Sequence, residues 1–387
     1  MSERSQMQSS SLFDYLNWRG DLPFETVPLG EVDSLILSIL SYIDYTGFVP
    51  HAANGERKPP VLLNVAKEFL RAQNGAIPNM GLIIPKETVT LFARSAKTTR
   101  FGLVRPFAYV NKICDESQEQ FCAVSFLLSG GDIFVAFRGT DDTLVGWKEN
   151  FNMSFILPVP AQRDAVEYLE DVAKMAHGRI YVGGHSKGGN LAVYAAVKAS
   201  EGVRERIAAV YNSDGPGFNT EFIAGEDYRT MKERIHTLVP QSSVVGMLLE
   251  HEESYTVVKS RLTGVLQHNG FSWEVMGAGF IKLDAISEES KLIDRSVKDW
   301  LEEMSADERA AVIDAIYDAI AATNAKTLTD LSQDKIKIVR AWNALDNDAR
   351  NQVRRCINII FGKKKQPKDV KDGKENRENK ENKENKE

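Results

Sequence analysis

The sequence is poor in cysteine: three occur among its 387 residues, at Cys114, Cys122 and Cys356. Their spacing contains no CxxC pair, which argues against a structural zinc site and against a disulfide framework. We therefore expect all three to be reduced thiols in the core of a protein from a reducing compartment.

Long apolar runs are also missing. The first ten residues, MSERSQMQSS, contain no apolar segment of the kind that a signal peptide needs, and LILSIL at 35–40 is too short to span a bilayer. There is no excess of basic residues, because the formal net charge is -6. This balance argues against a nucleic-acid-binding surface. We expect a cytoplasmic protein with no integral membrane segment and no nucleic-acid partner.

The composition divides the chain into regions. Residues 13–285 mix short apolar runs, amphipathic stretches and turn residues, and they are expected to form one α/β domain. Residues 286–361 contain neither glycine nor proline, which predicts a C-terminal helical region. The charged segment 362–387 has too few apolar residues to offset its ordering entropy, so we expect a disordered tail. Residues 1–12 are expected to be a disordered N-terminus.

Strands and helices alternate from residue 132 onward, and the predicted strands are rich in valine, isoleucine and alanine. This pattern predicts a mostly parallel sheet with helices on both faces. The carboxyl ends of such strands share one edge of the sheet, where sites form. The predicted strands are 120–129, 132–139, 179–184, 206–215, 236–240 and 254–260, and the predicted helices are 31–45, 88–96, 163–176, 187–200 and 220–235.

The stretch YVGGHSKGGN, residues 181–190, places Ser186 among glycines between a predicted strand and a predicted helix. It fits G-x-S-x-G, a sharp turn from which the serine projects while the glycines leave room. The helix that begins at Lys187 would offer its free N–H groups and its dipole to an oxyanion. A glycine-rich phosphate-binding turn is the alternative, but G-x-G-x-x-G and a complete P-loop are both missing. We predict Ser186 to be a nucleophile.

A nucleophilic serine needs a general base, and the sequence contains six histidines. His185 adjoins the serine, so we expect its side chain to point away from Ser186 and to pack. Sheet hydrolases carry their triad in the chain order Ser, acid, His, which leaves His251 and His268. His268 lies in a loop after the predicted strand 254–260 and is the predicted base. The remaining histidines are placed too early or at element ends: His51, His177 and His236.

The orienting acid is less constrained. Asp214 follows the strand after the Ser186 turn, and a carboxylate there could hold an imidazole in one tautomer. A turn or helix-capping aspartate is the competing interpretation. The next strand ends without a carboxylate, so Glu250, Glu252 and Glu253 are alternative acids.

A second oxyanion donor is predicted at Thr140, which follows a strand ending in Arg138-Gly139. An ordinary Gly-Thr turn is the alternative.

Two segments in this order, VAFRGTDDTLVGW and GGHSKGGNLAVYAA, resemble the F-R-G-[ST] and G-H-S-[LM]-G-G segments of class 3 (fungal-type) lipases. The resemblance covers roughly residues 120–275 and implies the α/β-hydrolase fold. It implies Ser186 as nucleophile, Thr140 and the Lys187 N–H as oxyanion hole, and His268 as base. We expect such a hydrolase to need no metal or organic cofactor. The wider chain resembles a bacterial group of lipase-like α/β-hydrolases with no assigned substrate.

The sequence departs from the lipase pattern at two positions. Lys187 replaces the usual apolar residue after the serine, although only its backbone N–H is needed for the chemistry. Ser243, in VPQSSVVG, stands where the lipases have their acid. Asp214 would then be a relocated acid that the resemblance itself does not supply.

The C-terminal region has the pattern of packed helices. Residues 305–323 begin with Ser305 and Glu308 at the spacing of a capping box, and residues 332–361 should form two helices broken near Asp346. We expect a small bundle docked on the α/β domain. It would serve either as a cap over the substrate pocket or as a module that binds a protein partner.

Together these features predict a serine hydrolase that cleaves a small-molecule or lipid carboxylic ester, with lipid favoured by the resemblance alone. Thioester or amide cleavage by the same residues stays open. The alternative is a catalytically silent α/β-hydrolase scaffold that binds a protein partner through residues 286–361.

Overall fold

The computed structural model describes residues 10–50 and 58–361. The expected disordered tail, 362–387, lies outside these residues, as does most of the expected disordered N-terminus. The last part of that N-terminal segment is ordered. The Ser10 hydroxyl donates a hydrogen bond of 2.7 Å to the Val275 carbonyl, and the buried Leu12 begins the first helix.

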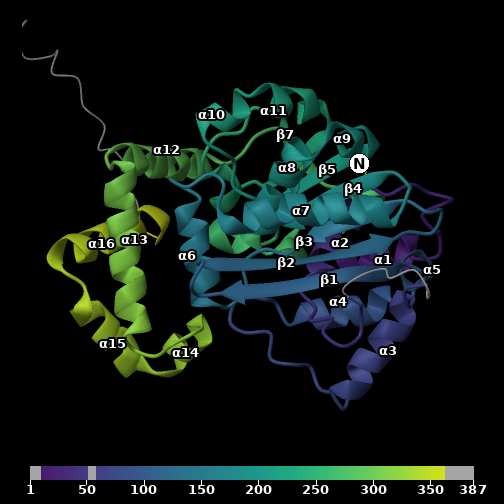
Figure 1. Ribbon diagram of the computed structural model, residues 1–387, viewed down its shortest axis with the longest axis horizontal. Coiled ribbons are helices and arrows are strands. Elements are labelled where there is room, and N and C mark those ends of the chain that lie inside the picture. Colours follow the sequence, from purple (N-terminus) through teal and green to yellow (C-terminus); the bar gives the residue numbers. More distant parts are fainter. Residues whose placement is uncertain (1–9, 51–57, 362–387) are drawn as a thin grey trace, which may run out of the picture.

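An eight-stranded sheet forms the centre of the molecule, in the order β1-β2-β3-β4-β5-β6-β7-β10 (Figure 1). Strands β3 to β7 are parallel, whereas β1, β2 and β10 join the sheet edges in antiparallel pairs. The predicted mostly parallel sheet is confirmed. The strands are β1 (Arg105–Cys114), β2 (Glu119–Leu127), β3 (Ile133–Phe137), β4 (Ile180–His185), β5 (Ile207–Ser213), β6 (Ile235–Pro240), β7 (Tyr255–Val258) and β10 (Lys282–Leu283), with a separate pair β8 (Val275–Met276) and β9 (Gly279–Phe280).

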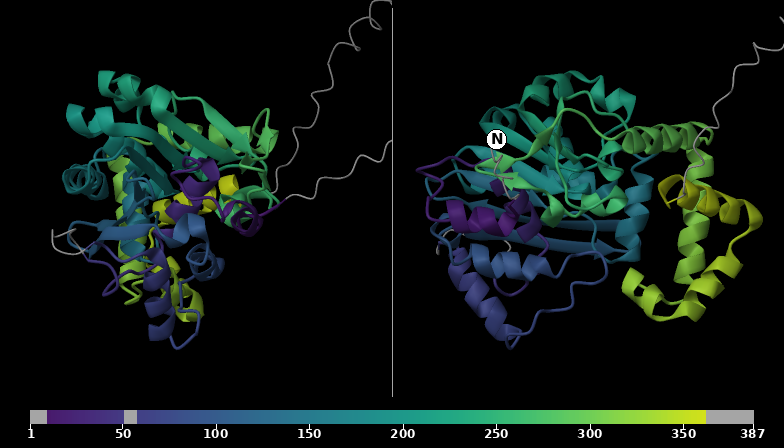
Figure 2. Two further views of the ribbon diagram at one scale, coloured as in Figure 1. Left: turned by 90° about the vertical axis from the view of Figure 1, so that its right-hand side faces the viewer. Right: turned by 180° about the vertical axis from the view of Figure 1, so that it is seen from behind.

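Helices cover both faces of this sheet, as predicted (Figures 1 and 2). Successive residues of a strand point to opposite faces, so β3 contributes Phe134 and Ala136 to one core and Ile133, Val135 and Phe137 to the other. The first core is closed by α1 (Leu12–Arg19), α2 (Glu31–Leu40), α3 (Leu62–Ala72), α4 (Glu87–Ser95) and α5 (Thr99–Gly102), and the second by α7 (Pro160–Met175), α8 (Lys187–Lys198), α9 (Glu201–Arg206), α10 (Thr220–Ile223) and α11 (Glu226–Met231).

Two expectations about individual elements were wrong. Strand β1 was not predicted, because its second half, from Val110 to Cys114, mixes apolar and polar residues and is largely exposed at the sheet edge. The single helix expected over 220–235 is two short helices, since Gly225 caps the second of them in an extended conformation. The expected hairpin of β2 and β3 is present, with Gly130 and Gly131 in the left-handed region at its turn.

The C-terminal helices stack beside α6 (Leu144–Asn152), which follows the carboxyl end of β3 (Figure 1, left side). Lys148 of α6 pairs with Asp314 at 2.8 Å, and the Leu144 N–H donates to the Lys326 carbonyl. This region therefore sits at the carboxyl edge of the sheet. Its helices are α12 (Glu288–Glu302), α13 (Ala306–Ala321), α14 (Leu328–Gln333), α15 (Lys335–Ala344) and α16 (Asn347–Phe361), with the predicted capping box at Ser305 and the predicted break after Leu345.

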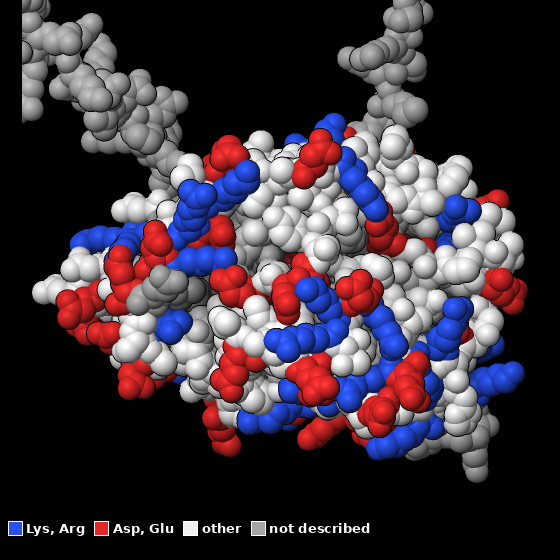
Figure 3. Space-filling model, turned by 90° about the horizontal axis from the view of Figure 1, so that it is seen from above, with Lys and Arg blue, Asp and Glu red and all other residues white. Residues whose placement is uncertain are grey.

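Acidic and basic side chains of the described residues are interspersed on the face that Figure 3 shows. None of the helices within residues 10–50 and 58–361 has the length and apolarity that a membrane crossing needs. Cys122 is buried on β2, but Cys114 at the end of β1 is partly exposed, so the expectation of a core position was wrong for that thiol. The Cys356 side chain lies outside the described part of the chain.

Candidate active site

Ser186 occupies a strained turn between β4 and α8. Its φ of 60° and ψ of -134° lie in a region that non-glycine residues rarely adopt, at a cost of roughly 1–3 kcal/mol. The turn is possible because its neighbours lack side chains. A Cβ on Gly184 would lie 2.1 Å from the Gly188 carbonyl carbon, and a Cβ on Gly188 would lie 2.1 Å from the Phe137 oxygen. The glycines that flank Ser186 are therefore required by close backbone packing.

The turn after β3 packs directly against Ser186. A Cβ on Gly139 would lie 3.1 Å from the Ser186 Cβ and 2.6 Å from the His185 oxygen, so only glycine fits there. The next residue, Thr140, is buried, and the Asn150 side-chain amide donates a 2.5 Å hydrogen bond to its Oγ1. Because that bond occupies an acceptor site of the hydroxyl, the Thr140 proton is free to be donated elsewhere. Sequence reasoning missed Asn150.

The predicted base and the predicted acid lie together. His268 Nδ1 is 2.6 Å from Asp214 Oδ2, and the Asp214 side chain is fully buried while that of His268 is 26% exposed. Asp214 Oδ1 accepts hydrogen bonds from Ser243 Oγ at 2.5 Å and from the Gly246 N–H at 3.1 Å. Ser243, at the position where the lipase motif has its acid, thus donates a hydrogen bond to the Asp214 carboxylate, which follows strand β5.

His268 contacts His185, the residue before Ser186, and therefore lies beside the Ser186 turn. The two imidazole rings are 4.6 Å apart between centroids, and His185 Nε2 is 2.7 Å from the His268 carbonyl oxygen. Burial, together with the neighbouring His268, lowers the pKa of His185 to about 3, so its ring is neutral at physiological pH. Nε2 then carries the proton and donates to His268, while Nδ1 faces the Tyr42 hydroxyl at 3.4 Å. The expectation that His185 only packs was incomplete.

The alternative acids have other partners. Glu253 lies 2.9 Å from His251 and accepts hydrogen bonds from Thr237 and Tyr228. Burial would raise the pKa of Glu253, but the contacts with His251 and these hydroxyls outweigh it and hold the pKa at about 2. Glu250 pairs with Lys298 at 3.1 Å, and Glu252 pairs with a lysine on η1 (Lys232–Arg234) at 3.4 Å. His251 therefore forms a second pair, separate from Asp214 and His268.

Lys187 has a role beyond its backbone N–H. Its side chain is 1% exposed, and Nζ is 2.8 Å from Glu149 Oε2 and 2.7 Å from the Gln120 carbonyl. Glu149 is fully buried and also accepts a hydrogen bond from the Ala161 N–H. This ion pair ties α6 to the first residue of α8, which explains why a lysine can replace the apolar residue that the lipase pattern has here.

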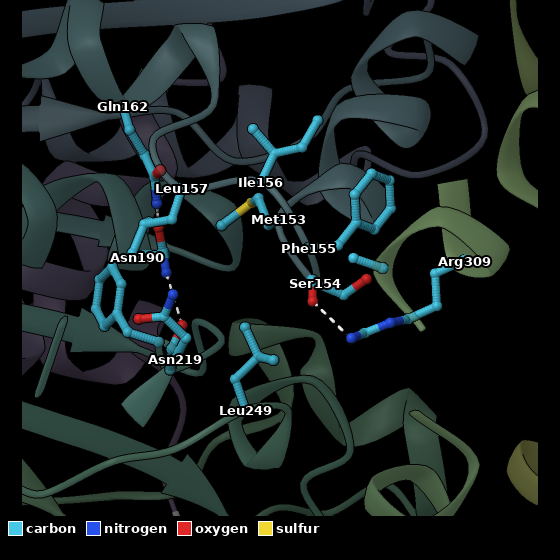
Figure 4. A pocket seen from close by; sticks show the side chains of 13 residues that line it. Met153, Ser154, Phe155, Ile156, Leu157, Gln162, Asn190, Asn219, Leu249 and Arg309 are labelled. Carbon is cyan, nitrogen blue, oxygen red and sulfur yellow. Dashed lines mark hydrogen bonds between the residues drawn. The ribbon is translucent and has the colours of Figure 1, made fainter. Parts of the chain in front are cut away.

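Two cavities lie near these residues. The larger, about 710 Å³, is bounded by Tyr42 and Arg138 on one side and by Thr327 at the start of α14 on the other. The smaller, about 220 Å³, lies where α13 meets the loop after β5 (Figure 4). Neither lining includes Ser186 or His268. Within the part of the chain that the structure describes, no three histidine, cysteine, aspartate or glutamate side chains are grouped closely enough to hold a metal ion.

The chain is structurally similar to lipases of known structure, as its motifs predicted. A Rhizomucor miehei lipase complexed with its propeptide is 14% identical, with a TM-score of 0.32 over 47% of this chain and 63% of the lipase. M37 lipase is 14% identical, with a TM-score of 0.36 over 65% and 84% of the two chains. Lip2 lipase from Yarrowia lipolytica is 10% identical, with a TM-score of 0.32 over 65% and 86%. At such values, any conclusion about catalysis rests on the residues of this chain.

Comparison with curated protein sequences gives no match. A family model does match: residues 95–318, which contain strands β1 to β10 and the Ser186 turn, match the Mbeg1-like family over more than half of the chain. The chain belongs to the Mbeg1-like family.

Proposed function

We propose that this protein is a serine hydrolase that cleaves carboxylic esters. The observation that carries the proposal is the 2.6 Å contact between His268 Nδ1 and Asp214 Oδ2, beside a serine held in a strained turn. A buried carboxylate on one imidazole nitrogen fixes the tautomer and leaves the other nitrogen as a base. Ser186, His268 and Asp214 would then act as nucleophile, base and orienting acid.

The proposed reaction has two halves. His268 Nε2 takes the Ser186 proton as Oγ attacks the ester carbonyl, and Asp214 stabilises the imidazolium. The tetrahedral oxyanion accepts hydrogen bonds from the Lys187 N–H at the amino end of α8 and from Thr140. The imidazolium protonates the departing alcohol as the C–O bond breaks. A water molecule, deprotonated by His268, then hydrolyses the acyl-enzyme and restores the Ser186 hydroxyl.

The substrate class is proposed from the lipase-like motifs and from the larger cavity. A lipid ester is favoured by the lipase-like motifs, and thioesters or amides would use the same chemistry. The larger cavity adjoins the Gly139 turn, because the Tyr42 hydroxyl that lines it would lie 2.2 Å from a Cβ on Gly139. Its volume of about 710 Å³ is in the usual range for ligand pockets. We propose this cavity as the place for one arm of the ester.

Residues 286–361 would act as a cap in this scheme, on a domain formed by residues 13–285. The N-terminal end of α14 lines the larger cavity with Thr327 and Thr329, and Ser290 of α12 donates a hydrogen bond to the Ser243 carbonyl.

The alternative of a catalytically silent scaffold rested on the missing acid at position 243. The contact of Asp214 with both Ser243 and His268 supplies an acid and favours the enzyme.

Esterase assays test the proposal. The full chain would be assayed with p-nitrophenyl esters from acetate to laurate, beside Ser186→Ala and the matched control Ser296→Ala, a partly exposed serine on α12. We expect turnover by the wild type and the control, and a loss of about 10³-fold or more in kcat for Ser186→Ala. A folded wild-type protein without turnover on any of these esters would favour the scaffold.

A further inference from the structure

The loop after β6 is hydrogen-bonded to the surroundings of both Asp214 and His268. The Ser243 hydroxyl donates to the Asp214 carboxylate. The Ser242 N–H donates a 2.8 Å bond to the side-chain oxygen of Gln267, the buried residue that precedes His268. Because these bonds start from two adjacent residues, a displacement of this loop would disturb the acid and the base together.

The start of α12 holds the same loop. The Ser287 N–H, just before the helix, donates a 2.6 Å bond to the Gln241 carbonyl, and the Ser287 hydroxyl lies 3.0 Å from that of Ser242. One turn further on, the Ser290 hydroxyl donates a 2.5 Å bond to the Ser243 carbonyl. Helix α12 also leads from the α/β domain to the other C-terminal helices (Figure 1). The loop that supports the acid is therefore fastened to the C-terminal region.

Apolar side chains of α12 reinforce this attachment. Ile293 and Val297, one helical turn apart, form a buried cluster with Val244 of the same loop. Val265 packs against this cluster from η3 (Gly264–His268), the short helix that ends in the proposed base. Helix α12 thus contacts both the loop that supports the acid and the segment that carries the base.

Ser290 has the shortest hydrogen-bonded route from α12 to the acid. Its side chain is fully buried, and the route passes through Ser243 to Asp214 and on to His268. A catalytic group that is misplaced by about 1 Å can lower the rate by about 10²-fold, even when the cause lies away from the chemistry. The hydroxyl of Ser290 is therefore placed to affect turnover without touching the reacting atoms.

We propose that Ser290 is a positioning residue: it fixes Ser243, which holds Asp214 in the orientation that aligns His268. This inference rests on the proposed function. It gives α12 a part in turnover that is separate from capping the substrate pocket and from binding a protein partner.

Steady-state kinetics of the full chain on p-nitrophenyl esters test the proposal, at a temperature where urea unfolding shows every variant to be fully folded. We expect Ser290→Ala to lower kcat about tenfold, the effect of about 1.4 kcal/mol on the barrier, with little change in KM. Ser296→Ala is the matched control, because it removes a hydroxyl of the same helix that bonds only to the Leu292 carbonyl one turn earlier. It should retain the wild-type kcat.

A double-mutant cycle with Ser243→Ala distinguishes positioning from a general loss of packing. If Ser290 acts through Ser243, the double variant should turn over at about the rate of Ser243→Ala alone, because the hydroxyl that Ser290 positions is already gone. Independent, multiplicative losses in kcat, or a Ser290→Ala variant as active as the wild type, would overturn the proposal. A wild type that hydrolyses none of these esters would instead contradict the proposed function, and this inference with it.

Discussion

The Ser243 hydroxyl donates a 2.5 Å hydrogen bond to Asp214, from the position where the lipase pattern has its own acid. Asp214 follows the end of β5, and Ser243 lies in the loop after β6. Ser243 is in turn held by Ser290 of α12, through a 2.5 Å bond from the Ser290 hydroxyl to the Ser243 carbonyl. A chain of hydrogen bonds thus runs from Ser290 of the C-terminal helices through Ser243 to Asp214 and on to His268.

Removal of the Ser243 hydroxyl should impair turnover without removing the acid. Ser243→Ala leaves one buried oxygen of Asp214 with only the Gly246 N–H as donor, at a cost of roughly 1–3 kcal/mol. We expect kcat on a p-nitrophenyl ester to fall about tenfold with little change in KM. Ser243→Thr, which restores the hydroxyl, should recover most of the rate. An alanine variant as active as the wild type would show that this bond does not position the acid.

Loss of either partner of the His268–Asp214 pair should abolish most of the activity. His268→Ala and Asp214→Asn are expected to lower kcat by about 10³-fold or more, because the first removes the base and the second favours the wrong tautomer. His177→Ala, at an exposed histidine, is the matched control and should retain full activity. Full activity in a folded Asp214→Asn variant would assign the acid elsewhere.

Stability should fall in acid because of His185. Burial holds the folded pKa near 3, whereas an unfolded histidine titrates near 6.5, so the unfolded chain binds the proton first. The stability that depends on neutral His185 is complete above about pH 6.5 and declines as the pH falls toward 3, by at most about 1.4 kcal/mol per pH unit. Glu253, with its pKa held at about 2, adds a loss of stability below about pH 4.5.

Urea unfolding between pH 7 and pH 4 would measure this slope. His185→Gln keeps a side-chain amide that can donate to the His268 carbonyl but does not titrate, so its slope between pH 6.5 and 4.5 should be shallower. An identical slope in the variant would assign the acid sensitivity to other groups.

The buried pair of Lys187 and Glu149 should respond asymmetrically to substitution. Lys187→Met leaves a fully buried carboxylate without its cation, which should lower the free energy of unfolding by about 3–5 kcal/mol. The double variant with Glu149→Gln removes both charges and should regain a large part of that loss. Urea unfolding of the four proteins measures the coupling, and additive losses would contradict a direct interaction.

The sheet and the Ser186 turn were predictable because local patterns encode them. Apolar runs that alternate with helical segments predict a parallel sheet. The glycines on both sides of Ser186 indicate a backbone that leaves no room for side chains. The support residues were not predictable in this way. Ser243 and Tyr42 reach the site from distant parts of the chain, and Asn150 reaches Thr140 from α6. A lone polar residue in a sequence does not show which partner it will contact. Strand β1 was missed because its exposed second half at the sheet edge lacks a clear apolar pattern.

The most direct test of the account is whether Ser186 is an activated nucleophile. The purified full chain would be treated with a fluorophosphonate and examined by intact mass, beside Ser186→Ala and His268→Ala. The account predicts one adduct on the wild type, none on Ser186→Ala, and labelling slowed by orders of magnitude in His268→Ala. No adduct on a folded wild-type protein, or an adduct that persists in Ser186→Ala, would contradict it.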